Sequence, residues 1–485
     1  MRLDRLVAEG ALLRGDGGVD VTALTADSRD VRPGALFAAL RGTDRDGFGF
    51  VGEALAGGAA ALLGDARLAE LQPPVPTVVD ADPRRQLALM AARFFVRQPA
   101  RVVAVTGTNG KSSTASFTRQ LWAAAGRRAA SLGTLGIEAP GRDPGASLTT
   151  PDPVRLHKLL AELAEDGIDD LVLEASSHGL DQRRVDGVSF GAAAFLNLTR
   201  DHIDYHGSEA AYRAAKWRLF DTLLPTGATA VINADLPISA ALLDEAHSLG
   251  LEVVDFGVAG RRLRLLEQRP EPVGQSLLLE IDGAKVATSL PVVGAFQAFN
   301  LLAAIGLVMA TGLTAAAALA GVPRLQPPRG RMQRAGAHPT GAPVFVDYAH
   351  TPDALDQALQ GLRPHCRGRL AVVFGAGGDR DRGKRPEMGR IAVARADRVI
   401  VTDDNPRSEE PARIRAEVLA AAPEAMEIGD RAEAIRAAVR DLQPGDVLLV
   451  AGKGHETGQI VGTEVKPFDD VAEVEAALRT LGGAA

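Results

Sequence analysis

One short segment combines glycines, a lysine and hydroxyl side chains directly after the apolar run VVAV. Glycines let backbone N–H groups converge on phosphate oxygens, the lysine reaches the terminal phosphates, and the hydroxyl after it is a typical magnesium ligand. A full phosphate loop would have a glycine where this chain has Val105, so the loop is a shortened form. We predict that nucleotide phosphates bind at Gly107, Thr108, Asn109, Gly110, Lys111, Ser112 and Ser113.

Three further segments carry side chains suited to a divalent cation. Glu174 ends the apolar run LVLE, His202 follows Asp201 in LTRDHIDYHG, and Lys216 stands in the helical stretch AAYRAAKWRLF. A carboxylate and a neutral imidazole can ligate a metal ion that bridges phosphates. Taken alone, Lys216 could equally be a solvated cation on a helix surface, and His202 could be a structural or surface histidine. Beside a phosphate loop, the three segments together predict a metal site.

Arginine supplies most of the positive charge, since only seven of the 54 Lys and Arg residues are lysines. The bias itself is typical of a GC-rich genome. Where arginine serves as the general surface cation, a remaining lysine indicates a position that needs a compact ammonium or a titratable amine. We expect Lys111 to need the first and Lys216 the second.

The elements that would position these residues alternate along the chain. From residue 101 onward, short apolar runs are separated by helical stretches such as PVRLHKLLAELAEDG, which predicts a mostly parallel sheet covered on both faces. SLLLEIDGAKVATSL predicts an antiparallel hairpin with an Asp-Gly turn. Proline-rich breakers divide the α/β chain into predicted domains at 1–85, 86–328 and 329–485.

Composition narrows the class of protein further. The 485 residues carry a net charge of −7, which argues against a general nucleic-acid binder. No apolar run approaches the length of a membrane span, and the acidic N-terminus lacks the apolar core of a signal peptide. The single cysteine, Cys366, excludes an internal disulfide. We therefore predict a cytoplasmic protein without membrane insertion.

Taken together, GTNGKS, LEASSHG, LTRDHIDYHG and the segment around Lys216 resemble the Mur ligases, the ATP-dependent amide-bond ligases of peptidoglycan assembly. The resemblance spans nearly the whole chain. It implies an N-terminal nucleotide-sugar-binding α/β domain, a central P-loop ATPase-like domain and a C-terminal Rossmann-like α/β domain. It also implies ATP and Mg²⁺ as cofactors and a monomer acting on small molecules.

The resemblance assigns roles to the residues already singled out. It implies that Lys111, Glu174, His202 and Lys216 are catalytic, and that Lys216 is carbamylated. The metal ligands would be Ser112, Glu174, His202 and the modified Lys216. A carbamate forms from a neutral amine and carbon dioxide, which is chemistry that arginine cannot perform.

Further motifs match the family's substrate contacts. For ATP these are Asn300, Arg331 and Asp347, while Gln297 stands where the family has asparagine. For a UDP-N-acetylmuramoyl dipeptide, the sugar contacts are Ser28, Thr43, Asp44 and Arg45. The dipeptide contacts are Thr149, Thr150, Ser176, Gln182 and Arg184, whose hydroxyls, amide and guanidinium suit carboxylates and amides.

The segment DNPR indicates which amino acid is added. Family members that add meso-diaminopimelate carry this sequence, and members that add lysine differ at the arginine. A guanidinium can hold the second α-carboxylate of diaminopimelate through two hydrogen bonds. Lysine lacks that carboxylate, so its binding would leave the guanidinium unpaired. The implied contacts are Arg385, Asp404, Asn405, Pro406, Arg407, Gly452 and Glu456.

The expected reaction is therefore the ATP-dependent addition of meso-diaminopimelate to the D-glutamate of UDP-N-acetylmuramoyl-L-alanyl-D-glutamate through an acyl phosphate. The same ligation with lysine, and a folylpolyglutamate-type ligase, remain alternatives within the enzymes. A nucleotide-dependent switch module without ligase activity is the alternative from another class.

Overall fold

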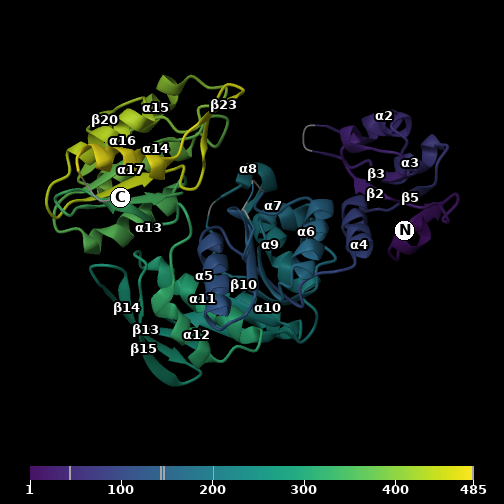
Figure 1. Cartoon of the computed structure of the whole chain (residues 1–485), viewed down its shortest axis with the longest axis horizontal. Helices are drawn as coiled ribbons and strands as arrows, with labels where there is room; N and C mark the ends of the chain where they lie inside the picture. The colour runs from purple at the N-terminus through teal and green to yellow at the C-terminus, as the bar shows by residue number, and fades with distance from the viewer. Residues whose placement is uncertain (43–44, 143–144, 146–147, 200, 483–485) are drawn as a thin grey trace.

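The computed structural model describes residues 1–485 except 43–44, 143–144, 146–147, 200 and 483–485. Its strands form three large sheets, each built from one continuous part of the chain, and a separate two-stranded hairpin. In Figure 1 the part with the central sheet adjoins both the N-terminal and the C-terminal part. The predicted α/β class is confirmed, while the exact domain limits at 85 and 328 stay predictions.

The N-terminal sheet has the order β1-β5-β4-β3-β2, with only β1 antiparallel to its neighbour. Its strands are β1 (Leu12–Arg14), β2 (Ala23–Thr25), β3 (Ala35–Ala38), β4 (Ala61–Gly64) and β5 (Thr77–Val79). Its short helices are α1 (Leu3–Leu6), α2 (Val51–Ala56) and α3 (Ala66–Leu71). Helix α4 (Pro83–Phe95) packs its Leu87 and Met90 into this core and also contacts α6 (Pro153–Glu165) of the central part. Helix α4 therefore connects the two parts.

The central sheet has the order β15-β14-β13-β12-β11-β10-β6-β9-β7-β8. The seven neighbouring strands β13-β12-β11-β10-β6-β9-β7 pair in parallel. The remaining strands, β8 at one edge and β14 and β15 at the other, are antiparallel additions. Asp282 and Gly283 both have positive φ (46° and 86°), as a type I′ turn requires, so the predicted Asp-Gly hairpin is confirmed. The strands are β6 (Arg101–Thr106), β7 (Ala129–Gly133), β8 (Gly136–Glu138), β9 (Asp170–Glu174), β10 (Phe190–Phe195), β11 (Thr229–Asn233), β12 (Glu252–Gly257), β13 (Leu263–Pro270), β14 (Gln275–Ile281) and β15 (Ala284–Leu290).

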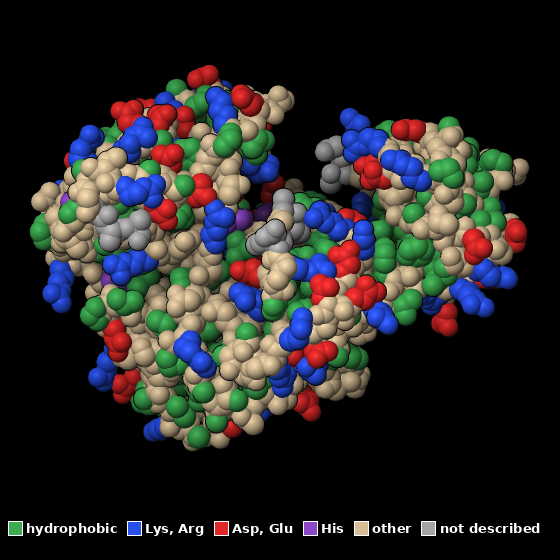
Figure 2. All heavy atoms as spheres, in the orientation of Figure 1, with side chains coloured by type: hydrophobic (Ala, Val, Ile, Leu, Met, Phe, Trp, Pro, Cys, Tyr) green, Lys and Arg blue, Asp and Glu red, His purple; other side chains and the backbone are tan. Residues whose placement is uncertain are grey.

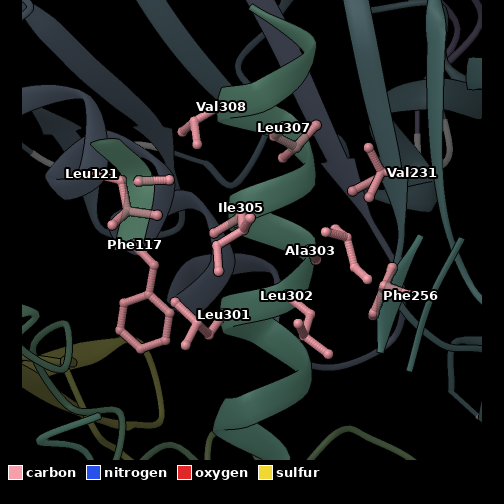
Figure 3. Close-up of a cluster of buried hydrophobic side chains, with 14 of the residues drawn as sticks. Phe117, Leu121, Val231, Phe256, Leu301, Leu302, Ala303, Ile305, Leu307 and Val308 are labelled. Atoms are coloured by element: carbon pink, nitrogen blue, oxygen red, sulfur yellow. The ribbon is translucent and has the colours of Figure 1, made fainter. Parts of the chain in front are cut away.

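Two long helices anchor this sheet. Helix α11 (Phe296–Ala310) is apolar around most of its surface, and its Leu301, Leu302 and Ile305 are fully buried. Figure 3 shows it between α5 (Lys111–Ala124) and strands β11 and β12. Burying each such side chain contributes about 1.5–3 kcal/mol to the free energy of unfolding. The contact with α11 therefore holds α5, the helix that follows the phosphate loop, in place. The remaining helices of this part are α7 (Ser177–Asp181), α8 (Ile203–His206), α9 (Glu209–Arg218), α10 (Ser239–Ser248) and α12 (Ala315–Gly321).

The C-terminal sheet has the order β16-β17-β21-β18-β19-β20, with β16 alone antiparallel. Polar and glycine-rich loops follow β17, β18, β19 and β21, so they meet at one edge, as in other open parallel sheets. The strands are β16 (Gln333–Ala337), β17 (Pro343–Asp347), β18 (Leu370–Phe374), β19 (Arg398–Val401), β20 (Met426–Glu427) and β21 (Val447–Ala451), with β22 (Gly458–Val461) and β23 (Glu464–Pro467) forming the hairpin. The helices are α13 (Pro352–Leu362), α14 (Lys384–Arg395), α15 (Pro411–Leu419), α16 (Arg431–Arg440) and α17 (Asp470–Thr480). None of the helices that the structure describes is long and apolar enough to cross a membrane.

A buried ion pair joins α16 to α17. The guanidinium of Arg431 donates two hydrogen bonds of 2.7 Å to Asp470, and both side chains are fully buried. We expect Asp470→Ala to lower the free energy of unfolding by about 3–5 kcal/mol, because Arg431 would keep its charge in the core without a partner. Urea unfolding measures this loss. The control is Arg436→Ala, since the exposed pair between Arg436 and Glu473 links the same helices and is worth at most about 1 kcal/mol. Equal losses in both variants would contradict the prediction.

Candidate functional site

The phosphate loop is held in shape by two asparagines from outside it. It lies between β6 and α5, and the side-chain oxygen of Asn197 accepts hydrogen bonds from the backbone N–H groups of Thr108 and Asn109 at 3.0 and 2.9 Å. Gly110 has φ +89°, and a Cβ there would lie 2.3 Å from the Asn300 side-chain oxygen. Only glycine fits this close approach. Sequence reasoning missed Asn197, whose signal was a polar residue just after the strand AAAFL.

The two lysines of the predicted site converge on one carbonyl. The amines of Lys111 and Lys216 donate to the Gly107 oxygen at 2.9 and 2.8 Å. The Lys216 side chain is buried, and its amine lies 4.5 Å from the centre of the Tyr212 ring. Burial and the neighbouring Lys111 hold the pKa of Lys216 well below its usual range. The site therefore favours a neutral amine at Lys216.

Glu174 ends β9 and is buried beside the start of α5. Its carboxylate accepts hydrogen bonds from the hydroxyls of Ser112 and Thr134, both at 3.1 Å, and from the Thr134 backbone N–H at 3.1 Å. The Thr134 hydroxyl also lies 2.9 Å from that of Thr149. Sequence reasoning identified Glu174, Ser112 and Thr149 but missed Thr134, which links them.

His202 lies at the entrance of α8 with φ +52°. Its Nε2 atom lies 3.3 Å from a carboxylate oxygen of Asp201, and the His178 ring lies edge-on at 4.7 Å between centroids. Burial lowers the pKa of His202, which favours the neutral imidazole that a metal ion requires. Among the described residues, no three His, Cys, Asp or Glu side chains form a complete metal site by themselves.

A cavity of about 290 Å³ at the boundary between the central and C-terminal parts is lined by Lys111, Glu174 and His202, while the buried Lys216 lies behind the loop on the Gly107 carbonyl. The central part contributes the loop from Thr108 to Ser113 together with Thr134, Thr149, Glu174, Ser176, Asp201, His202, Phe296 and Gln297. The C-terminal part contributes Arg331, Asp347, Tyr348, His350 and Thr351, with Ala349, Ala354 and Gln357. A second cavity of about 420 Å³ shares Asn109, Gly110 and Phe296 with the first and is lined further by Phe256, Phe299 and Asn300. Apart from Gly107, the predicted ATP residues thus line two adjoining cavities, and the second of them is lined by aromatic rings.

Arg331 and Asp347 form the C-terminal wall of the first cavity. The Arg331 guanidinium lies over the Tyr348 ring at 4.4 Å, and one of its nitrogens lies 3.5 Å from the Ser112 hydroxyl. Asp347 accepts hydrogen bonds from the backbone N–H groups of Met332 and Ala349 at 2.6 and 2.9 Å. Burial raises the pKa of Asp347 to about 6. Both residues therefore face the phosphate loop from the neighbouring part of the chain.

Four of the five predicted dipeptide residues, Thr150, Ser176, Gln182 and Arg184, form one hydrogen-bonded network, while Thr149 contacts Thr134. The Thr150 and Ser176 hydroxyls lie 3.1 Å apart, and Arg184 donates to the Thr150 carbonyl and to the Gln182 side-chain oxygen, both at 2.7 Å. Gln182 in turn donates to the Tyr205 hydroxyl at 3.0 Å. The network surrounds the ends of the short helix α7, which Ser176 caps by accepting from a backbone N–H. The structure therefore brings together residues from two separate sequence motifs.

The predicted sugar contacts lie in the N-terminal part. Ser28 begins a short 3₁₀ helix (Ser28–Asp30), and Arg45 is exposed to solvent. Thr43 and Asp44 lie outside the described residues. Figure 2 shows a hollow between the N-terminal and C-terminal parts, above the central part. Neither Ser28 nor Arg45 lines the cavity at the phosphate loop.

The loop after β19 and the loop after β21 join in a polar cluster. The buried amine of Lys453 donates to the Asn405 side-chain oxygen at 2.9 Å and to Glu456 at 3.2 Å, and Asn405 donates to Glu456 at 2.9 Å. Gly452 has φ +118°, and a Cβ there would lie 2.9 Å from an Asp404 carboxylate oxygen. Four of the predicted amino-acid contacts, Asp404, Asn405, Gly452 and Glu456, are thus neighbours.

The two predicted arginines of this cluster differ in their partners. Arg385 is fully buried, and its guanidinium pairs with Glu409 at 2.7 Å and Glu417 at 2.8 Å. The Arg407 guanidinium donates to the backbone carbonyls of Gly378 (2.8 Å) and Asn405 (3.4 Å), and it forms no ion pair among the described residues. Burial, together with the nearby positive charge of Arg380, lowers the pKa of Arg407. The positive charge of Arg407 is therefore not paired with a carboxylate of the described residues. Gly378 lies directly against Pro406, the residue before Arg407, since a Cβ added at Gly378 would lie 1.9 Å from the Pro406 carbonyl oxygen.

A hydrogen bond across the two parts supports the phosphate loop. Asp353, in the first turn of α13, accepts from the Asn109 side-chain amide at 2.8 Å and from the Thr199 hydroxyl at 3.5 Å. We expect Asp353→Ala to raise the KM for ATP about fivefold, which corresponds to about 1 kcal/mol for one hydrogen bond. The control is Asp356→Ala on the same helix, where Asp356 pairs with Arg395 at the surface. Phosphate release against ATP concentration measures both, and equal KM values would contradict the prediction.

Comparison with known proteins places these features in a family. The model "Mur ligase family, catalytic domain" matches residues 20–95, "Mur ligase middle domain" matches 105–308, and "Mur ligase, glutamate ligase domain" matches 330–454. A UDP-N-acetylmuramoyl-L-alanyl-D-glutamate–2,6-diaminopimelate ligase from Bradyrhizobium diazoefficiens is 52% identical over 483 residues, which are 99% of each chain. The ligase of the same name from Caulobacter vibrioides is 54% identical over 467 residues, 94% of this chain and 95% of the relative.

Solved structures agree with the sequence relatives. A structure of a UDP-N-acetylmuramoyl-L-alanyl-D-glutamate–2,6-diaminopimelate ligase superimposes with a TM-score of 0.70, at 34% identity and over 95% of each chain. A Mycobacterium tuberculosis folylpolyglutamate synthase has the same fold, with a TM-score of 0.63 at 21% identity over 82% of this chain and 93% of that chain. Because close relatives match almost the entire length and the family models fall on all three sheets, the chain belongs to the Mur ligase family.

Proposed function

We propose that this ligase joins meso-2,6-diaminopimelate to the D-glutamate of UDP-N-acetylmuramoyl-L-alanyl-D-glutamate with hydrolysis of ATP to ADP and phosphate. The observation that carries the proposal is Arg407, a half-buried guanidinium without a carboxylate partner among the described residues, beside Asn405 and Glu456. Diaminopimelate supplies the missing carboxylate at its second α-carbon, and Glu456 suits the accompanying ammonium. The names of the relatives that match over the full length support the same reaction.

The reaction proceeds in two balanced steps. A D-glutamate carboxylate oxygen attacks the γ-phosphorus of ATP, the bond from that phosphorus to the β–γ bridging oxygen breaks, and ADP leaves. The neutral amine of diaminopimelate then attacks the acyl carbon, the amide bond forms, the carbon–oxygen bond to phosphate breaks, and one amine proton is released. Lys111 lines the cavity that we assign to the phosphates, and Arg331 lines its opposite wall, while the Asn197 side chain holds the N–H groups of Thr108 and Asn109. Such fixed charges provide most of the catalysis in phosphoryl transfer.

The residues at the phosphate loop fit a magnesium ion. Mg²⁺ in such sites is held by one or two carboxylates together with substrate phosphates and water, so a complete protein cage is not needed. The buried Glu174 carboxylate, already in contact with the Ser112 hydroxyl, provides oxygen ligands of the right kind. We assign the ion to Ser112, Glu174, His202 and a carbamate on Lys216. When bound, it neutralises charge on the phosphate oxygens.

The substrates would occupy the two cavities and the hollow. We assign the ATP phosphates to the loop from Gly107 to Ser113, with Asn300, Arg331 and Asp347 as further ATP contacts. We assign the dipeptide to the network of Thr149, Thr150, Ser176, Gln182 and Arg184, and the nucleotide sugar to Ser28, Thr43, Asp44 and Arg45. The sugar would then lie in the hollow that Figure 2 shows between the N-terminal and C-terminal parts.

A panel of amino acids tests the proposal. Phosphate release by the purified protein is measured with ATP, the UDP-dipeptide and either meso-diaminopimelate, L-lysine or L-glutamate, and mass spectrometry identifies the product. We expect turnover with diaminopimelate to exceed that with lysine by at least about tenfold, because lysine leaves Arg407 unpaired. Comparable rates with lysine would overturn the specificity. Release that is independent of any amino acid would indicate a nucleotide switch.

A further inference from the structure

A small hairpin lies directly against the segment that carries Arg407. Strands β22 and β23 form a separate two-stranded sheet outside the C-terminal sheet. The hairpin begins at residue 458, beyond the region 330–454 that matches the family's shared C-terminal domain model. It is therefore an element additional to the part of the domain that the family model describes.

Four hydrogen bonds join β22 and its turn to the segment from Asp404 to Arg407. Gln459 donates its side-chain amide to the Asp404 carbonyl at 2.7 Å, and the Ile460 N–H donates to the Asn405 side-chain oxygen at 2.9 Å. The Arg407 N–H donates to the Ile460 carbonyl at 3.1 Å, and the Gly462 N–H donates to the Arg407 carbonyl at 2.7 Å. The hairpin thus acts as a short parallel partner strand for this segment.

These bonds support an unfavourable backbone conformation. Arg407 has φ +54°, in the left-handed region that side-chain-bearing residues seldom adopt. Both backbone hydrogen-bonding groups of Arg407 are satisfied by the hairpin and by nothing else that the structure describes. In this conformation the guanidinium reaches the Gly378 carbonyl on the neighbouring loop. The hairpin therefore holds the backbone from which the guanidinium extends.

We propose that the β22–β23 hairpin is a specificity element that positions Arg407 for a second α-carboxylate, with Gln459 as a positioning residue. The inference rests on the proposed function, because it concerns the amino-acid site of that reaction. Part of the selectivity for diaminopimelate would then depend on residues that follow the region 330–454, which matches the family's C-terminal domain model. None of the hairpin residues needs to touch the substrate for this effect.

Two variants test the role of the hairpin. In Gln459→Leu the bond to the Asp404 carbonyl is lost at similar side-chain volume, and in the second variant two glycines replace residues 459–466, joining the paired ends Gly458 and Pro467. The control is Glu464→Gln, an exposed position on β23. We measure kcat/KM for diaminopimelate and for lysine, the KM for ATP, and thermal unfolding for each protein.

We expect the preference for diaminopimelate over lysine to fall about fivefold in Gln459→Leu and at least about tenfold in the truncated variant, with the KM for ATP unchanged. Glu464→Gln keeps the preference of the natural chain. Unchanged preference in both variants, or a parallel rise in the KM for ATP, would overturn the inference. If the natural chain itself shows no preference for diaminopimelate, the proposed function fails instead, so the two failures are distinguishable.

Discussion

Lys216→Ala is expected to lower amino-acid-dependent phosphate release by about 10²–10³-fold, the usual cost of removing one group that stabilises charge in a transition state. The buried amine shares the Gly107 carbonyl with Lys111, so two ammonium groups there would repel each other. Burial and Lys111 therefore keep the Lys216 amine neutral, and carbamylation gives this neutral group a negative charge. Lys111 and the modified Lys216 would then attract each other, and the new carboxylate could bind the metal ion.

Chemical rescue distinguishes a carbamate from an ordinary lysine. We expect added acetate to restore part of the activity of Lys216→Ala, whereas sodium chloride at the same ionic strength does not. Mass spectrometry of the natural protein kept in bicarbonate should show the addition of one carbon dioxide. The control is Lys158→Ala, since Lys158 is exposed on α6 and should not affect turnover. Full activity of Lys216→Ala without acetate would remove the residue from the mechanism.

Arg407→Ala is expected to lower kcat/KM for diaminopimelate by about 10–100-fold, the value of one charge-assisted hydrogen-bonding group. The KM for ATP should be unchanged, because Arg407 does not line either cavity at the phosphate loop. Arg407→Lys should not restore the rate fully, since an ammonium cannot form the paired bonds of a guanidinium. Initial rates at varied diaminopimelate and ATP measure both constants.

A matched control removes another arginine of the same part. Arg390 is exposed on α14, and Arg390→Ala should keep both constants. An unchanged KM and kcat for diaminopimelate in Arg407→Ala would show that the guanidinium does not bind the amino acid. A loss of ATP binding in that variant would instead indicate a general structural role.

The sequence predicted those features that depend on local pattern. The phosphate loop, the Asp282-Gly283 turn and the alternation of strands and helices each follow from residues that are neighbours in the chain. The partners of these residues could not be predicted in the same way. Asp353 meets Asn109 across 244 positions, and only the packing of the two parts brings them together.

Arg385 illustrates the same limit within one motif. Its position in GGDRDRGKRPEM suggested a substrate contact, as for Arg407. Two glutamates neutralise Arg385: Glu409, two positions after Arg407, and Glu417 on α15, and neither was identified from the sequence. Its contact with the amino acid stays a prediction, and its Nε atom is buried without a hydrogen-bond partner in the described structure.

Helix α4 has a mechanical consequence. It is part of the N-terminal core at one face and contacts α6 of the central part at another, and its 13 residues span about 20 Å. A tilt of about 10° at one end would therefore displace the other by about 3 Å, roughly the length of a hydrogen bond. A small change in the angle between α4 and α6 would thus make or break contacts between the N-terminal part and a substrate that reaches both parts.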